Sequence, residues 1–304
     1  MIEIPANTRV YGMQLPVQAQ SEMFVAEWER TAGPAELAKI ANAADDYGFH
    51  YVGVCDHIAL TEDYAARMGT HWSDCIGTMS WLAALTRRVN VLSHAYVLPY
   101  RHPLIAAKQF ATLDHLSGGR AIVGIGGGHV EPEFEKLGVD YHRRGKLVDE
   151  RLPVLAAALE HEYVDGYGAK PRPVQQPRPP IWIAGSSPAA IRRAARYEGW
   201  LPQGPADADM IGALWREREA NGSADRPFAI GHVVLGFVYV GVPDWDAGEG
   251  TVSGSPEQVA EQILAGTPDG VNQLQVRFRA RSCEELCDQI AAFGTSVAPL
   301  VTKL

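Results

Sequence analysis

The stretch Ala121-Ile-Val-Gly-Ile-Gly-Gly-Gly-His129 is an apolar, β-branched run that ends in glycines and a histidine. Such a run predicts a buried strand whose carboxyl end lets another molecule approach the backbone closely. A dinucleotide-binding turn needs glycine at its first, third and sixth positions, followed directly by a helix. Counted from Gly124, the sixth position is His129, and Pro132 follows closely, so the stretch does not fit a Rossmann turn. We therefore interpret it as a strand that ends at a ligand cavity, with a titratable histidine at its edge.

Strands and helices alternate along the whole chain around this stretch. The other expected strands cover residues 8–15, 49–55, 89–97, 180–184, 199–202, 228–240 and 272–278. The expected helices cover residues 34–47, 74–88, 104–116, 143–161, 189–197, 207–220, 255–264 and 283–293. Eight strands, each followed by a helix, predict an α/β fold of the (β/α)8 TIM-barrel type, which typically takes about 250 residues. We expect residues 1–304 to form one such domain, with loop insertions near 58–73 and 163–180.

The composition narrows the classes of partner and the location. Hydrophobic residues make up 46% of the chain and charged residues 21%, which is enough for a sizeable core. With 27 Lys and Arg against 36 Asp and Glu, the net charge is −9, and we expect no binding to nucleic acid or anionic membranes. The sequence has no signal-peptide pattern and no apolar run of membrane-spanning length, which predicts a cytoplasmic protein. Cys283 and Cys287 lack a second ligand pair nearby, so we expect no metal site.

The active site of a TIM barrel lies at the carboxyl ends of its strands. Asp56 and His57 directly follow one expected strand, and a carboxylate beside an imidazole is suited to proton transfer near neutral pH. In a simpler interpretation, Asp56 caps the following turn and His57 is merely exposed. Other candidates by position alone are Gln14, Ser93, His94, Gly126 to His129, Gly185 to Ser187, Gln203 and Gly204.

The turn Gly185-Ser-Ser-Pro188 places small residues directly before an expected helix. Free backbone N–H groups and hydroxyls at a helix start can hold a phosphate. The same pattern is also that of an ordinary serine N-cap followed by proline at the first helical position. A phosphate site after a late strand, together with an acid/base pair after an early one, predicts a phosphorylated cofactor lying across the mouth of the barrel.

Five motifs in this order closely resemble the luciferase-like monooxygenase superfamily, over essentially the whole chain. They are Leu98-Pro-Tyr-Arg-His-Pro103, Thr112-Leu-Asp-His-Leu-Ser-Gly-Gly-Arg120, Gly124-Ile-Gly-Gly-Gly128, Ile181-Trp-Ile-Ala-Gly-Ser-Ser-Pro188 and Gly199-Trp-Leu-Pro202. The sequence is most similar to the actinobacterial deazaflavin branch of this superfamily, which uses coenzyme F420.

The resemblance implies a role for each candidate residue. It makes His57 an acid/base beside the deazaflavin ring, and we expect Asp56 to orient it. It puts Ser93 and His94 behind the ring, at a strand end where a cis peptide bond before a residue other than proline is common. The remaining cofactor contacts it implies are Gly126, Gly127 and Gly128 as a backbone wall where a side chain would collide with the ring, His129 at the edge of that wall, and Gly185, Ser186 and Ser187 around the phosphate.

His129 departs from the pattern, because sugar-phosphate-oxidising members carry a glutamate at this position. A glucose-6-phosphate type of substrate is therefore not expected. The loop that contains Trp72 either closes over the substrate or anchors the helix that follows it.

Three functions remain open from the sequence. The first is an F420-dependent oxidoreductase that moves a hydride between the deazaflavin C5 and a small organic substrate, with His57 handling the proton. The second is a luciferase-like monooxygenase that uses FMN and molecular oxygen. The third is a barrel that binds a flavin without catalysis or serves only as an oligomer subunit. A metal-dependent hydrolase is disfavoured because no His-x-His pair follows the first strand. The superfamily is commonly dimeric, and we expect a homodimer.

Overall fold

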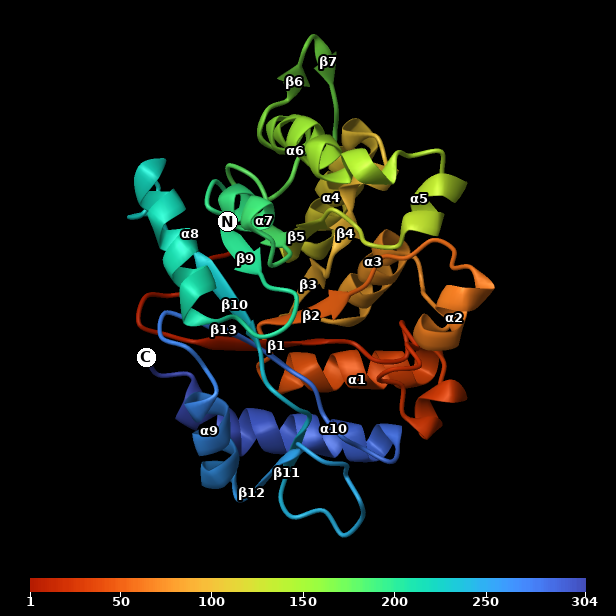
Figure 1. Ribbon diagram of the computed structural model, residues 1–304, viewed down its shortest axis with the longest axis vertical. Coiled ribbons are helices and arrows are strands. Elements are labelled where there is room, and N and C mark those ends of the chain that lie inside the picture. The colour runs from red at the N-terminus through yellow and green to blue at the C-terminus, as the bar shows by residue number, and fades with distance from the viewer.

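Eight parallel strands close into a barrel in the computed structural model, which describes residues 1–304 (Figure 1). Each strand pairs in parallel with its two neighbours, and the last pairs with the first. All eight lie within strands that the sequence predicts, so the prediction of a TIM barrel is confirmed. In barrel order they are β1 (Val10–Gln14), β2 (Tyr51–Val54), β3 (Asn90–Ser93), β5 (Ala121–Gly126), β8 (Ile181–Ala184), β9 (Gly199–Leu201), β10 (Ala229–Val233) and β13 (Gln273–Val276).

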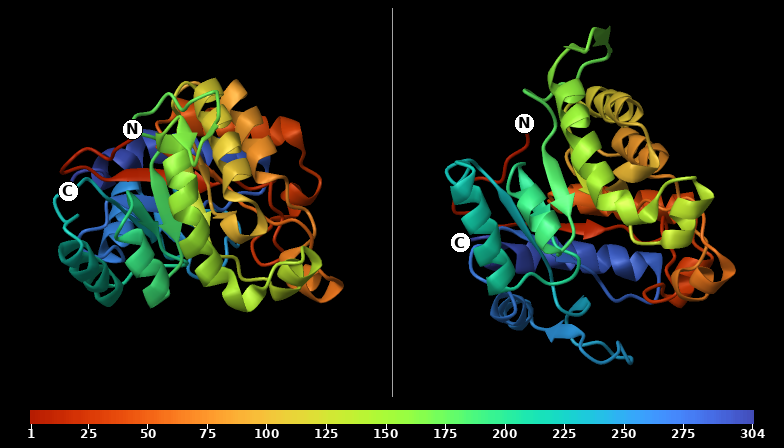
Figure 2. Two further views of the ribbon diagram at one scale, coloured as in Figure 1. Left: turned by 90° about the horizontal axis from the view of Figure 1, so that it is seen from above. Right: turned by 45° about the horizontal axis from the view of Figure 1, so that its top comes forward.

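A helix follows each barrel strand and packs on the outside of the barrel (Figure 2). None of them combines the length and the apolar character needed to cross a lipid bilayer. The eight helices are α1 (Pro34–Asp46), α3 (Cys75–Leu85), α4 (Pro103–Ser117), α6 (Arg144–Glu160), α7 (Pro188–Ala194), α8 (Ala208–Ala220), α9 (Pro256–Ala265) and α10 (Cys283–Ala292).

Several connections carry structure that the sequence patterns do not predict. The insertion near 58–73 contains α2 (Glu62–Met68), and α5 (Glu131–Lys136) begins soon after the glycine-rich strand. The insertion near 163–180 carries an antiparallel hairpin, β6 (Tyr163–Val164) and β7 (Tyr167–Gly168), at the top of Figure 1. The other short elements are β4 (Tyr96–Val97), β11 (Val238–Val240), β12 (Val252–Gly254) and α11 (Ala298–Val301).

The long strand expected over residues 228–240 is in fact two strands. β10 ends at Val233 and β11 begins at Val238, where the chain leaves the barrel and pairs with β12. Gly236, between them, has a φ of 80°, a conformation that interrupts an extended chain. The break moves Phe237 away from the barrel wall and onto the loops at the strand ends.

The barrel interior is filled by its own cluster of apolar side chains, one from each of six strands. Gly12 and Gly199 make room for it, because a Cβ at either position would lie 2.4 Å from the Tyr51 or the Trp182 ring. Ile2 and Ile4 pack against the same cluster. The cavity described below lies at the carboxyl ends of the strands. The cluster consists of Tyr51, Leu92, Ile122, Trp182, Leu201 and Ala229.

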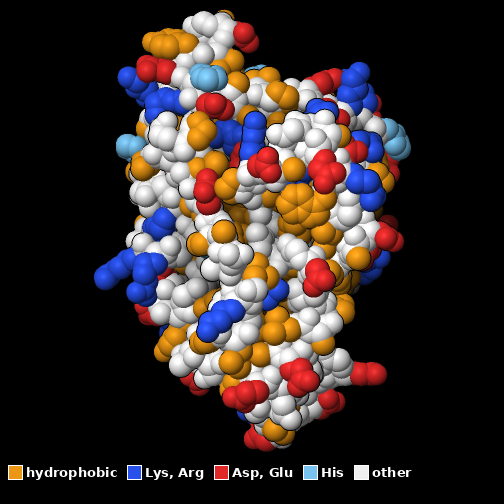
Figure 3. Space-filling model, turned by 90° about the vertical axis from the view of Figure 1, so that its left-hand side faces the viewer, with side chains coloured by type: hydrophobic (Ala, Val, Ile, Leu, Met, Phe, Trp, Pro, Cys, Tyr) orange, Lys and Arg blue, Asp and Glu red, His pale blue; other side chains and the backbone are white.

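Charged side chains of both signs are interspersed on the face of the molecule shown in Figure 3. Acidic side chains gather at the lower end of this view, in keeping with the net charge of −9. The blue side chains on this face form no continuous stripe of the kind that follows a nucleic-acid backbone.

Candidate active site

A cavity of about 1200 Å³ occupies the carboxyl end of the barrel. Ligand pockets usually measure roughly 300–1,000 Å³, so this one has room for a cofactor and a substrate together. The loops that follow all eight strands line it, and every predicted site residue except Ser93 lies on its wall. One lining residue from each loop, in barrel order, is Gln14, Asp56, His94, Gly126, Gly185, Gln203, Phe237 and Arg277.

His57 is held in place by a buried glutamate. Its Nδ1 lies 3.0 Å from Oε2 of Glu133, whose side chain is 1% exposed. The same carboxylate accepts hydrogen bonds from the Tyr100 hydroxyl at 2.8 Å and from the backbone N–H groups of Ala59, at 3.1 Å, and Ile58. A carboxylate with four donors and no acceptor around it is ionised. Nδ1 of His57 therefore carries a proton and donates it to Glu133, and Nε2 is left without a protein partner.

The pKa of Glu133 reflects two opposing effects. Burial of the carboxyl group acts to raise its pKa. The hydrogen bonds from His57, Ile58 and Tyr100 favour the ionised form and outweigh burial, so the pKa lies below its ordinary value. The negative charge that fixes the His57 ring is therefore present at neutral pH.

The prediction that Asp56 orients His57 is wrong. Both oxygens of Asp56 are held by the Arg101 guanidinium, at 2.5 Å and 2.7 Å, and one of them also accepts the backbone N–H of Val97. A guanidinium offers a charged, bidentate partner, which a carboxylate binds more strongly than a neutral imidazole. Asp56 thus fixes the chain after β2 to the chain after β3.

Two further rings enclose His57. The Trp72 ring lies with its centroid 4.5 Å from that of His57, and the His129 ring lies at 5.6 Å, both edge to face. Burial and the nearby His57 lower the pKa of His129, which is therefore neutral at pH 7. Trp72, from the loop considered as a cover for the substrate or an anchor for the next helix, lines the cavity wall next to His57.

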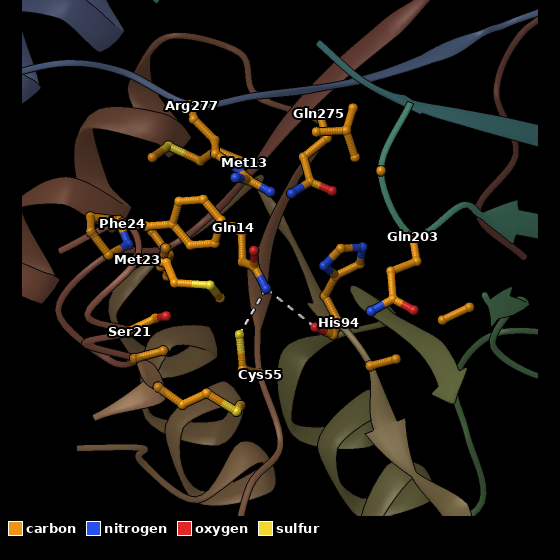
Figure 4. A pocket seen from close by; sticks show the side chains of 18 of the residues that line it. Met13, Gln14, Ser21, Met23, Phe24, Cys55, His94, Gln203, Gln275 and Arg277 are labelled. Atoms are coloured by element: carbon orange, nitrogen blue, oxygen red, sulfur yellow. Dashed lines mark hydrogen bonds between the residues drawn. The ribbon is translucent and has the colours of Figure 1, made fainter. Parts of the chain in front are cut away.

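Gln14, Cys55 and His94 lie together near the centre of the cavity (Figure 4). Gln14 Nε2 lies 2.7 Å from Cys55 Sγ and 3.4 Å from the His94 backbone oxygen. Burial, assisted by Arg277, lowers the pKa of His94 to about 4, and burial raises the pKa of Cys55 to about 11. Both groups are therefore uncharged at neutral pH. The His94–Ala95 peptide bond is cis, as the resemblance implies for this strand end.

Ser93 does not reach the cavity, which corrects its predicted contact with a cofactor. Its hydroxyl is fully buried between β3 and β5, where it donates to the Gly124 oxygen and accepts from the Gly124 N–H, both at 2.9 Å. The two strands approach so closely that a Cβ at Gly124 would lie 1.9 Å from the Ser93 carbonyl oxygen. Ser93 is thus part of the barrel wall.

The three glycines at the end of β5 and directly after it line the cavity for different reasons. At Gly128, where φ is 77°, a Cβ would lie 2.7 Å from the Phe134 ring and 2.8 Å from Val97. The protein itself requires glycine there, so collision with a bound ring is not needed to explain it. At Gly127 the nearest atom to an added Cβ is 3.9 Å away, and the backbone conformation is ordinary. At Gly126 an added Cβ would lie 3.3 Å from the Ala95 Cβ, which is a tight contact, so only at Gly127 do the surrounding protein atoms leave the absence of a side chain unexplained.

The turn Gly185–Ser187 has features of both structures considered for it, a serine N-cap and a phosphate-binding turn. The Ser187 hydroxyl accepts the Ala190 N–H at 3.2 Å and is the N-cap of α7, as the simpler interpretation has it. The backbone N–H groups of Ser186 and Ser187 make no hydrogen bond within the protein. Both N–H groups lie on the cavity wall and are available to an anion, whereas Arg193, which lines the wall beside them, is already paired with Asp149 at 2.7 Å.

Comparison with known proteins identifies the family. The family model described as luciferase-like monooxygenase matches residues 13–250, which is most of the chain. The protein belongs to the luciferase-like monooxygenase family. This establishes the family that the sequence motifs indicate.

The luciferase-like relatives compared with this chain include both flavin and deazaflavin enzymes. An uncharacterised protein of Mycobacterium tuberculosis is 34% identical over 53% of this chain and 59% of its own. The FMNH2-dependent dimethylsulfone monooxygenase of Pseudomonas putida is 27% identical over 77% of this chain and 64% of its own. The chain thus spans less than two thirds of the length of these relatives. The solved F420-dependent tetrahydromethanopterin reductase of Methanopyrus kandleri shares the fold, with a TM-score of 0.70 at 19% identity over 96% of this chain and 99% of that one.

Glu133 is the residue of this luciferase-like site that the sequence does not reveal. Glu131, Pro132 and Glu133 follow the glycine-rich stretch, and proline with acidic residues is a signal for a helix start. That signal could have indicated a short helix here, but it does not tell which glutamate is buried. Glu133 is 1% exposed, whereas Glu131 is half-buried and pairs only with the exposed His142.

Proposed function

We propose that the protein is a coenzyme F420-dependent oxidoreductase that transfers a hydride between the deazaflavin C5 and a small organic substrate. The observation that carries this proposal is the His57–Glu133 pair on the cavity wall. Hydride exchange with an alcohol, a carbonyl or a carbon–carbon double bond also moves one proton. A histidine held at Nδ1 by an ionised carboxylate is suited to carry that proton at Nε2.

The residues of the cavity fit a phosphorylated deazaflavin. The free N–H groups of Ser186 and Ser187 would hold its phosphate, and Gly126 and Gly127 leave a flat wall for its ring system. Nδ1 of His94 is buried without a hydrogen-bond partner and would bind a polar edge of the ring. When bound, the deazaflavin supplies or accepts the hydride at C5. The F420 dependence named for the Methanopyrus kandleri reductase supports this choice of cofactor.

The protein residues have separate tasks in this reaction. Glu133 keeps Nδ1 of His57 protonated, so that Nε2 takes a proton when the substrate is oxidised and returns one when it is reduced. His129 is neutral and lies edge to face with His57, where it can pass the proton toward solvent. Trp72 covers the other side of His57 and shields the hydride from water.

An FMN-dependent monooxygenase is the second candidate, and one observation favours it. The dimethylsulfone monooxygenase, described as FMNH2-dependent, aligns with 77% of this chain. The phosphate turn and the glycine wall would serve FMN as well as a deazaflavin. Non-catalytic binding of a flavin is the third candidate.

Cofactor titrations separate the first two candidates. We expect reduced or oxidised F420 to bind with quenching of its fluorescence, and FMN to bind at least tenfold more weakly. Visible spectra of the protein saturated with each cofactor supply an independent readout. FMN binding without F420 binding would replace the proposal with the monooxygenase.

Replacement of His57 by alanine separates catalysis from mere binding. We expect turnover of any substrate to fall about 10²- to 10⁴-fold, the usual contribution of a general acid or base, while F420 affinity stays within twofold. His71→Ala, an exposed histidine in the same loop, is the matched control. Unchanged turnover in His57→Ala would favour a barrel that binds a flavin without using this residue.

A further inference from the structure

Two guanidinium groups in the cavity have no anionic partner. Arg277 and Arg279 follow β13, and neither side chain makes an ion pair or a hydrogen bond within the protein, although the Arg279 Nε atom is buried. The next arginine, Arg281, is paired with Asp244 at 3.1 Å and Glu285 at 2.8 Å. Buried charges in proteins are normally paired, because the loss of water around them is costly. The chain carries nine more negative than positive side chains, yet none of its carboxylates pairs with Arg277 or Arg279.

The two arginines stack on aromatic rings instead. The Arg277 guanidinium lies 4.6 Å from the centroid of Phe24, and that of Arg279 lies 3.8 Å from the centroid of Phe237. The two phenylalanine rings are themselves 6.5 Å apart. Stacking engages the flat faces of the guanidinium groups and leaves their N–H edges free for a ligand. Burial also lowers the pKa of Arg277, the direction expected for a cation without a counter-ion.

Other unpaired donors lie on the same wall. Trp245 Nε1 and Gln275 Nε2 are buried without a hydrogen-bond partner, like Arg279 Nε. Arginine and tryptophan side chains can only donate hydrogen bonds, so a ligand that satisfies them must supply acceptors. These three donors outnumber the unpaired acceptor of the cavity, Gln18 Oε1, and with positive charge among them they match an anionic group.

These residues lie across the cavity from the expected phosphate site. Phe24, Phe237 and the arginines come from the loops after β1, β10 and β13, which are neighbours in the barrel. The Gly185–Ser187 turn follows β8, which β9 and β10 separate from β13. In Figure 4, Arg277, Phe24 and Met23 lie on one side of the cavity and Gln203 on the other, with Gln14 and His94 between them. The arginines are therefore not part of the turn that would hold the cofactor phosphate.

We infer that Arg277 and Arg279 form an anion subsite for the substrate, which is a small organic acid with an apolar body. The acid group would lie on the free edges of the two guanidinium groups, and its apolar part would contact Phe24, Phe237 and Met23, which borders the cavity. The reacting carbon would then lie toward the middle of the cavity, between this subsite and the proposed cofactor wall. The assignment of the anion as substrate rests on the proposed function; the existence of the subsite does not.

The test compares acids with their uncharged amides. We would titrate the protein with benzoate, phenylacetate and 3-phenylpropionate, and with the three matching amides, and measure affinity by calorimetry and intrinsic tryptophan fluorescence. We expect at least one acid to bind tenfold or more tightly than its amide, as a charge-assisted hydrogen bond allows. The Arg277→Gln/Arg279→Gln double variant should lose that preference and keep its F420 affinity within twofold. Arg281→Gln, whose side chain is already paired, is the matched control and should retain the preference.

Three results would overturn the inference. The first is that no acid binds more tightly than its amide. The second is that the double variant keeps the preference or that Arg281→Gln loses it. The third is that the double variant loses tenfold or more in F420 affinity, because the arginines would then serve the cofactor. The acid and amide titrations need no cofactor, so they test the subsite even if F420 does not bind. A Tm for the double variant within a few degrees of wild type shows that lost binding is not lost folding.

Discussion

A single buried carboxylate, that of Glu133, connects segments 76 residues apart in the sequence. It joins the loop after β2, through His57, Ile58 and Ala59, to the start of α5. Carboxylates that orient a catalytic or ligating histidine contribute to activity without touching the substrate. Glu133 is therefore a positioning residue, and its removal should affect both turnover and stability.

We expect Glu133→Gln to lower turnover about 10- to 100-fold, because the amide no longer fixes the His57 tautomer. It should also lower the free energy of unfolding at pH 7 by about 1–3 kcal/mol, since an amide group would face backbone and hydroxyl donors. The pKa of Glu133 is lowered in the folded state, so its stabilisation is present above the ordinary carboxyl pKa of about 4.3 and is lost as the pH falls through the lower, folded value. Urea unfolding of both proteins at several pH values between 3 and 7 measures this. A difference that does not shrink at acidic pH would contradict it.

At the scale of elements, the turn after β5 is fixed by its packing against α5. Gly128 has φ of 77° and packs against Phe134 of α5, whereas a Cβ at Gly127 would make only an ordinary contact, 3.9 Å from Val148. We expect Gly128→Ala to lower the free energy of unfolding by about 2–4 kcal/mol, from backbone strain and overpacking together. Gly127→Ala should change stability by less than about 1 kcal/mol but weaken F420 binding, since its methyl group would lie on the proposed ring wall. Thermal unfolding and F420 titration of both variants check this, and equal stability losses would contradict it.

The regular alternation of strands and helices made the barrel elements predictable from the sequence. Several short elements in the connections were not predicted. The strand from 121 to 126 and the helix from 144 to 160 are long enough for their apolar periodicity to be read from the sequence. α2 and α5 are short and lie inside strand–helix connections, where the alternation of barrel strands and helices gives no reason to expect a further helix. The break between β10 and β11 lies at Gly236, whose positive φ cannot be read from a run that is otherwise rich in strand-forming residues.

At the scale of the whole molecule, the barrel topology explains which part of the site was predictable. Carboxyl ends of parallel strands converge, so the placement of His57, His94 and Gly185 on one cavity follows from the fold alone. The fold does not determine which side chains hydrogen-bond to one another within the cavity. Asp56 is next to His57 in the sequence, yet Arg101 takes its carboxylate and Glu133 takes the histidine. Charged groups from different loops compete for the same partners, and this competition decides which pairs form. No local sequence pattern indicates its outcome.

The outer faces of two neighbouring helices carry the exposed apolar side chains expected of a subunit interface. On α3, Trp81 and Leu85 lie one turn apart and are 38% and 40% exposed; on α4, Ile105 and Leu116 are 56% and 72% exposed. Several large exposed apolar side chains on neighbouring helices are typical of a subunit interface, and we propose that a second copy of the chain covers them. Sedimentation of the wild-type protein should then give twice the mass of one chain. Ile105→Asp/Leu116→Asp should sediment as a monomer with near-normal thermal stability, because both positions are exposed.

Val242→Asp is the control for this experiment. Val242 is an apolar residue far along the chain that is 86% exposed, and its variant should remain a dimer. A monomeric wild-type protein, or dissociation by Val242→Asp as well, would show that α3 and α4 do not form the interface.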